Sequence, residues 1–81
     1  MIKCSEYDYI EIVCLYRYPI KITLHNDEFI EGIAMDTVRN KQREECIKIK
    51  QENQLIDVVL DHICELQVCI ENPHFHIISF Q

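Results

Sequence analysis

The chain is organised around residues 4–14, which read CSEYDYIEIVC. Three small or apolar side chains recur there at helical spacing and form one stripe: Ile10, Val13 and Cys14. Ser5 stands where an N-cap residue would stand, and Asp8 follows three positions later, as in an acidic variant of the capping box. Carboxylates in a first turn also suit the positive end of the helix dipole. The stretch therefore predicts a short amphipathic helix with an acidic, tyrosine-bearing face.

Beyond this helix, apolar and polar residues alternate in short stretches, as is typical of strands with one buried face. Five strands are predicted, over residues 20–25, 28–36, 45–50, 55–60 and 64–70. Turns are expected at Asn26-Asp27 and at 51–53 (with Asn53 left-handed), a polar loop at 37–44 and a 3₁₀ turn at 61–63. The strands should therefore form two hairpins and a fifth strand.

Gly32 is the only glycine and lies inside the second predicted strand. A glycine there permits a sharp bend or a close approach of two backbones. A sheet bent in this way can close into a small barrel. The inward positions predict one core, made of Ile10, Val13, Ile22, Leu24, Ile33, Ile47, Ile49, Val58 and Leu66.

We expect one domain over 1–81, with the helix and its connector over 1–18, the five strands over 19–70, and a tail or extra edge strand over 71–81. A hydrophobic content of 48% with 27% charged residues describes a globular chain. The longest apolar run, 12–16, is far too short to cross a bilayer. No export signal is visible, so we expect a cytoplasmic protein that does not bind membranes.

The net charge of −6 is unevenly distributed along the chain. Residues 1–38 carry seven acids and three bases, residues 39–50 five bases and two acids, and residues 51–81 five acids and no base. Most of the surface should repel nucleic acid and attract a basic partner. The basic cluster allows three interpretations: an RNA patch, a solvated loop, or a contact with acidic residues of the same partner.

Metal binding and catalysis find little support in the sequence. His74 and His76 would share one face of a strand, but a zinc site needs more ligands at suitable spacing. There is no Gly-rich loop or nucleophile elbow to position a cysteine and a histidine for catalysis. We therefore expect no enzyme activity, no metal and no cofactor.

Several residues resemble those of a known family. Cys4, Tyr7-Asp8, Ile10-Glu11 and Cys14 match Cys-x-x-Tyr-Asp-x-(Leu/Ile)-Glu-x-x-Cys, the opening motif of the Rof (YaeO) family of bacterial Rho-binding antiterminators. Further similar segments lie at 20–24, at 36–39 and at 60–63, where His62 replaces the family's lysine. The resemblance covers about residues 2–70. It implies an Sm-like fold that is mainly β, with one N-terminal helix and a small bent five-stranded antiparallel barrel.

The resemblance also implies an activity. Such proteins inhibit Rho-dependent termination by binding the Rho hexamer at its primary RNA-binding region, which hinders RNA loading. The chain would then be a monomer in isolation that binds no nucleic acid directly. The expected partner-binding residues are Glu6, Tyr7, Asp8, Tyr9, Glu11, Arg39, Lys41 and Arg43. The alternative is an Sm-like RNA-binding module that uses the basic segment 39–50.

The five cysteines give a first test. Their number is odd, no CxxC pair exists and no export signal is visible, so we expect small, mostly buried free thiols at Cys4, Cys14, Cys46, Cys64 and Cys69. Alkylation under denaturing conditions, followed by mass spectrometry, should modify all five. A stable mass deficit equal to one disulfide would contradict this prediction.

Overall fold

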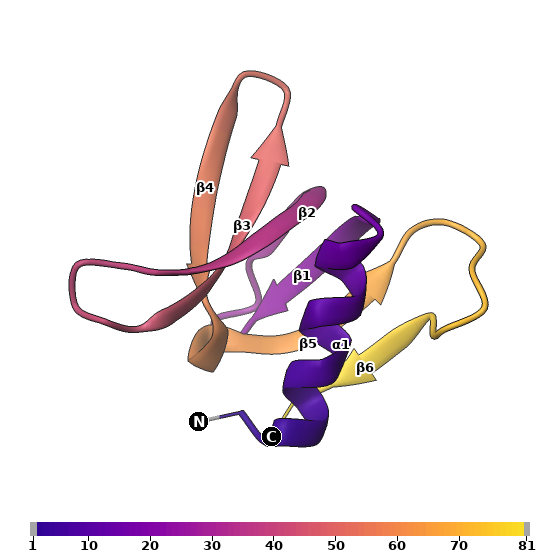
Figure 1. Ribbon diagram of the computed structural model, residues 1–81, viewed down its shortest axis with the longest axis horizontal. Helices are drawn as coiled ribbons and strands as arrows, with labels where there is room; N and C mark the ends of the chain where they lie inside the picture. The colour runs from indigo at the N-terminus through magenta and orange to yellow at the C-terminus, as the bar shows by residue number, and fades with distance from the viewer. Residues whose placement is uncertain (1, 81) are drawn as a thin grey trace.

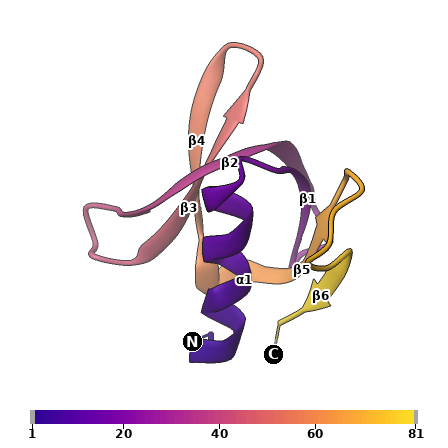
Figure 2. The ribbon, with the colours of Figure 1, turned by 45° about the vertical axis from the view of Figure 1, so that its right-hand side comes forward.

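The computed structural model describes residues 2–80; Met1 and Gln81 of the expected domain lie outside the described residues. Figure 1 shows the elements in chain order. They are α1 (Cys4–Leu15), β1 (Pro19–Leu24), β2 (Phe29–Arg39), β3 (Glu45–Gln51), β4 (Gln54–Val59), the 3₁₀ turn η1 (Leu60–His62), β5 (Ile63–Val68) and β6 (Ile77–Ser79). The strands form one antiparallel sheet in the order β4-β3-β2-β1-β5-β6. The sheet bends strongly, and α1 lies against it (Figure 2).

The expected class, mainly β with one N-terminal helix, is confirmed, but the sheet has six strands and is not closed. Within residues 2–80 the strand order is linear, with β4 and β6 at its two edges. β6 pairs with β5, where Leu66 lies opposite Ile78. A strand that closed the sheet into a barrel would need that same edge of β5, which β6 occupies. The predicted five-stranded barrel is therefore corrected to a bent, open, six-stranded sheet.

The start of α1 differs from the predicted cap. The N-cap residue is Lys3, and Ser5 lies inside the helix. The backbone N–H of Lys3 donates to the Glu6 carboxylate at 2.9 Å. Glu6 is the third helical residue, so this bond is the returning half of a capping box. The capping carboxylate is therefore that of Glu6, and the prediction that used Ser5 and Asp8 was wrong.

The end of α1 is a Schellman motif. The N–H of Tyr18 donates to the carbonyl of Val13 at 3.0 Å, and the N–H of Arg17 donates to that of Cys14 at 3.2 Å. This geometry needs a left-handed residue between helix and strand, and Arg17 supplies it with φ 54°. Glycine is the residue that usually takes this position. The connector thus fixes the direction in which the chain leaves the helix.

Seven of the nine predicted core residues are buried, and two are not. Ile33 is 39% exposed, and Leu24 is only half-buried. In β2 the inward positions are those of Ile30, Gly32 and Ala34, which places Ile33 on the outer face. The predicted alternation of β2 was correct, but the wrong one of its two faces was assigned to the core.

The bounds of other elements also shift. β2 continues to Arg39, so the loop expected over 37–44 begins at Asn40. β5 ends at Val68, two residues before the predicted end of its strand, and Ile70 beyond it is 50% exposed. Asp27 is left-handed as its turn requires, whereas Asn53 is not among the left-handed residues. The 3₁₀ turn is present, one residue earlier than predicted.

The tail packs across the helix and supplies the extra edge strand. The ring of Phe75 meets that of Tyr9 edge-on, with centroids 4.8 Å apart, and His74 stacks on Tyr16, also at 4.8 Å. Phe80 is buried in the core. Aromatic contacts of this kind stabilise beyond the area that they bury. The tail is therefore docked through its aromatic residues and through the pairing of β6 with β5.

All five cysteines are free thiols. Cys14 and Cys46 are buried and Cys64 is half-buried, but Cys4 and Cys69 are exposed. The expectation of mostly buried thiols is thus wrong for the two exposed ones. Cys4 is the first residue of α1, and Cys69 lies just beyond β5, so neither reaches the core.

At Gly32 the backbones of β2 and β3 approach closely, and a substitution there tests whether the bend needs this approach. A Cβ atom at this position would lie 2.5 Å from Cγ2 of Ile49 and 2.6 Å from the carbonyl oxygen of Lys50. Gly32→Ala should lower the free energy of unfolding by about 1–3 kcal/mol, because overpacking forces the backbone to shift. Urea unfolding followed by circular dichroism measures this change.

The matched control for this variant is Glu31→Ala, a change at the neighbouring, exposed position of the same strand. Exposed substitutions usually alter stability by no more than about 0.5 kcal/mol. An unchanged unfolding midpoint for Gly32→Ala would show that the two backbones do not need this close approach.

Candidate functional site

The exposed face of α1 carries two carboxylates, Asp8 and Glu11, spaced three residues apart. Residues at this spacing are neighbours on a helix surface. Both side chains are exposed, and neither makes an ion pair or a hydrogen bond to any residue in the described range 2–80. The helix therefore presents two carboxylates that the rest of the domain does not neutralise.

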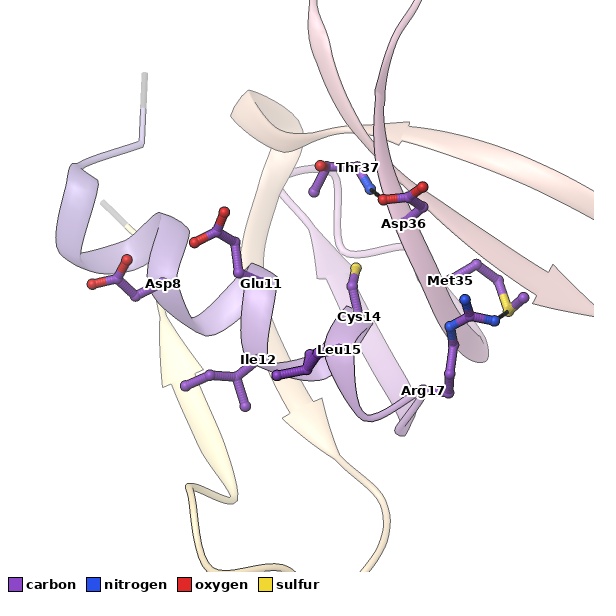
Figure 3. A pocket seen from close by; sticks show the side chains of 9 residues that line it. All are labelled: Asp8, Glu11, Ile12, Cys14, Leu15, Arg17, Met35, Asp36 and Thr37. Carbon is purple, nitrogen blue, oxygen red and sulfur yellow. Dashed lines mark hydrogen bonds between the residues drawn. The ribbon is translucent and has the colours of Figure 1, made fainter.

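One groove lies between α1 and β2, and we call it the α1–β2 groove. Its volume is about 640 Å³, and its charged side chains are Asp8, Glu11, Arg17 and Asp36. Figure 3 shows Asp8 and Glu11 along the helix and Asp36 on the strand opposite. Asp36 accepts the backbone N–H of Thr37 at 2.8 Å, which fixes its carboxylate. Three acids and one base make this groove negative.

The protonation of Cys14 fits the negative character of this groove. Burial, and then the Asp36 carboxylate, raise the pKa of the Cys14 thiol to about 11. Because the thiolate is the reactive form of cysteine, Cys14 is a poor nucleophile at neutral pH. The wall of the groove is thus a neutral thiol beside carboxylates, an arrangement suited to binding cations rather than to covalent catalysis.

A second groove lies between the start of α1 and the loop that joins β2 to β3, and we call it the α1–loop groove. Its volume is about 760 Å³. It brings together residues from both predicted sets, since Tyr7 and Asp8 come from the helix and Arg39 and Arg43 from the basic segment. Asp8 borders both grooves. The two grooves therefore flank the acidic helix face and share one of its carboxylates.

The cationic side chains of the basic segment 39–50 differ from one another in their contacts. Arg39 lies 3.8 Å from the carboxylate of Glu45, and it donates to the carbonyl of Arg43 at 3.0 Å. The guanidinium of Arg43 makes no such bond within residues 2–80. Lys41 is exposed and lines neither groove. Only part of the basic segment therefore faces the helix.

Two acidic-helix residues that the sequence singled out are placed elsewhere. Glu6 is only 7% exposed, and its carboxylate caps the helix. Tyr9 contacts Phe75 of the tail and lines neither groove. Tyr7 is half-buried against the core and lines the α1–loop groove. The structure thus brings together Tyr7, Asp8, Glu11, Arg39 and Arg43, but not Glu6, Tyr9 or Lys41.

Sequence reasoning missed Arg17 and Asp36 as parts of this surface. Asp36 stands in one of the segments that resemble the Rof family, which was the only signal available for it. Arg17 lies in the short connector after the helix and belongs to none of the sequence motifs. Both reach the surface because the bent sheet places the start of β1 and the middle of β2 beside α1 (Figure 3).

Neither a cluster of metal ligands nor a membrane-spanning helix is present in residues 2–80. Among residues 2–80, no three His, Cys, Asp or Glu side chains are placed to hold a metal ion. His74, one of the two histidines considered for such a site, stacks on Tyr16. Over the same range, every helix is too short or too polar to span a membrane.

Comparison with known proteins identifies the family. The family described as modulator of Rho-dependent transcription termination (ROF) matches residues 1–80. A solved structure described as YaeO bound to magnesium, from Vibrio cholerae O395, is 39% identical, with a TM-score of 0.89. The match covers 93% of this chain and 97% of that one. No curated protein matches the chain. The chain therefore belongs to the Rof family of modulators of Rho-dependent transcription termination.

Proposed function

We propose that the chain inhibits Rho-dependent termination by binding the Rho hexamer at its primary RNA-binding region, where it hinders RNA loading. It acts in the cytoplasm, as a monomer before binding, and performs no chemical step. The observation that carries this proposal is the pair of exposed carboxylates, Asp8 and Glu11, which lack an ionic partner within residues 2–80.

The mechanism is competition for cations. A region that holds RNA does so chiefly with Arg and Lys side chains that contact phosphates. Carboxylates on a rigid helix can pair with those side chains and deny them to RNA. Asp36, across the α1–β2 groove, adds a third carboxylate. The net charge of −6 steers the chain toward such a basic surface and speeds association.

The predicted contact residues take different roles in this proposal. Asp8 and Glu11 contact the partner directly, with Tyr7, Arg39 and Arg43 nearby, and Lys41 contacts it from the exposed loop outside the two grooves. Glu6 acts indirectly, because its carboxylate caps the helix that carries the other acids. Tyr9 also acts indirectly, because it holds the tail against that helix. Substituting Glu6 or Tyr9 should therefore affect stability before it affects binding.

The alternative, an RNA-binding module built on the basic segment 39–50, calls for cations free to hold phosphates. Arg39 pairs with Glu45, and Lys48 lies 2.9 Å from the carboxylate of Asp57, so two of the five cations already have partners. A gel-shift assay with single-stranded RNA, run beside co-elution with purified Rho, separates the two functions. Co-elution without a gel shift is the expected result.

Charge reversal on the helix tests the proposed face. Glu11→Lys should weaken Rho binding by about 1–3 kcal/mol, because a cation would then face the partner's cations. The fold should persist, since Lys is a good helix former at an exposed position. Binding should also weaken as salt rises, because exposed charges are screened over about 8–10 Å at physiological ionic strength. Titration of Rho with labelled protein measures both effects.

Glu52→Lys is the matched control, with the same change in net charge in the exposed turn between β3 and β4. It should bind Rho almost as the wild type does, and circular dichroism should show both variants folded. Arg43→Glu tests the loop. If Glu11→Lys binds Rho and relieves termination like the wild type, while Arg43→Glu does not, the working face is the loop and the helix assignment is wrong.

A further inference from the structure

Three described residues other than glycine have a left-handed backbone, and two of them are arginines. They are Arg17 (φ 54°), Asp27 (φ 68°) and Arg43 (φ 66°). Aspartate tolerates this conformation because its short side chain bonds locally, but arginine has no such advantage, and glycine would take it without strain. The backbone alone therefore does not explain why arginine stands at two of these positions.

Both arginines lie beside α1. Arg17 lines the α1–β2 groove, and Arg43 lines the α1–loop groove. Asp27 belongs to the turn between β1 and β2 and lines neither groove. Residues held in unfavourable backbone conformations cluster at functional sites, where the surrounding structure fixes them. The strained arginines thus stand at opposite flanks of the surface proposed to bind the partner.

Neither guanidinium forms an ion pair within the described part of the chain. The contact of Arg17 is the sulfur of Met35 at 3.9 Å, which is a weak acceptor, and Arg43 has no side-chain contact of this kind. By contrast, Arg39 pairs with Glu45. Both strained side chains are exposed, so each can accept an external anion.

We propose that Arg17 and Arg43 are specificity residues, each binding a carboxylate of the protein partner on either side of the acidic helix face. This inference rests on the proposed function. Asp8 borders both grooves, and Glu11 and Arg17 line the α1–β2 groove, so the two acids of the helix lie between a groove that holds Arg43 and the end of the helix that is followed by Arg17. A matching partner carries basic side chains flanked by acidic ones.

The alternating pattern distinguishes a protein from a nucleic acid. RNA is negative throughout and would meet Asp8 and Glu11 between the two arginines, which disfavours it. A uniformly basic protein surface would attract the acids and repel the arginines. The planar guanidinium binds a carboxylate through two parallel hydrogen bonds, a geometry that lysine does not offer. The arginines therefore favour a basic partner surface that also carries carboxylates at matching positions over one that is uniformly basic.

Replacement by glycine separates binding from folding. Arg17→Gly and Arg43→Gly should each raise the melting temperature, because the strain is relieved, yet weaken Rho binding about five- to tenfold. Asp27→Gly is the matched control, a left-handed turn residue outside both grooves, and it should leave Rho affinity unchanged. Arg17→Lys and Arg43→Lys keep the positive charge but lose the planar guanidinium that can form two parallel hydrogen bonds. Their affinity for Rho should therefore lie between that of the glycine variants and that of the wild type.

Each other outcome counts against the inference in a distinct way. If the wild type binds Rho and both glycine variants bind as tightly, the inference is overturned and the proposed function stands. If the variants lose affinity for single-stranded RNA and keep it for Rho, the arginines hold phosphate, which also overturns it. A wild type that does not bind Rho contradicts the proposed function, and the inference falls with it.

Discussion

The close approach of β2 and β3 at Gly32 is the constraint on which the rest of the structure depends. The space beside this residue is filled by Ile49 and by the backbone of Lys50, so no larger residue fits without a shift of the strands. The bend made possible there lets the sheet pack against α1 and bury Ile10 and Val13 completely. It also sets β2 beside the helix, which creates the α1–β2 groove. A packing requirement of the core thus determines the shape of the surface.

Much of the fold could be predicted because most strands bury one face, and that burial leaves an alternating pattern. The pattern was ambiguous in β2, where Ile33 marks the outer face and the inner face carries the small residues Gly32 and Ala34. Part of the surface escaped prediction for another reason. The capping bond of Glu6 is local, but position 3 holds a lysine instead of a usual N-cap residue, so Ser5 was the more obvious choice. That Asp36 lies across from α1 depends on tertiary structure, which periodicity and composition do not encode.

A domain with so small a core gains specificity by making its surface rigid. The helix is fixed at its start by the bond from Lys3 to Glu6 and at its end by the Schellman motif. The carboxylates between these ends therefore lose little freedom on binding, which lowers the entropic cost of association. On the outer face, Lys48 pairs with Asp57, and Nζ of Lys21 lies 4.1 Å from the centroid of the Phe29 ring. On α1, Asp8 and Glu11 have no ion pair within residues 2–80, so their charges stay available to a partner.

The docking of the tail on the helix has a consequence for the order in which the chain is made. Tyr9 emerges early from the ribosome, but its partner Phe75 is synthesised only after the five other strands. Contacts between such distant residues form slowly, because a long loop must close first. The helix is therefore the first element to be synthesised and among the last to be fully packed. The tail therefore reaches its place against the helix only after residues 74–80 have been synthesised, even though the local bonds at both ends of α1 can form earlier.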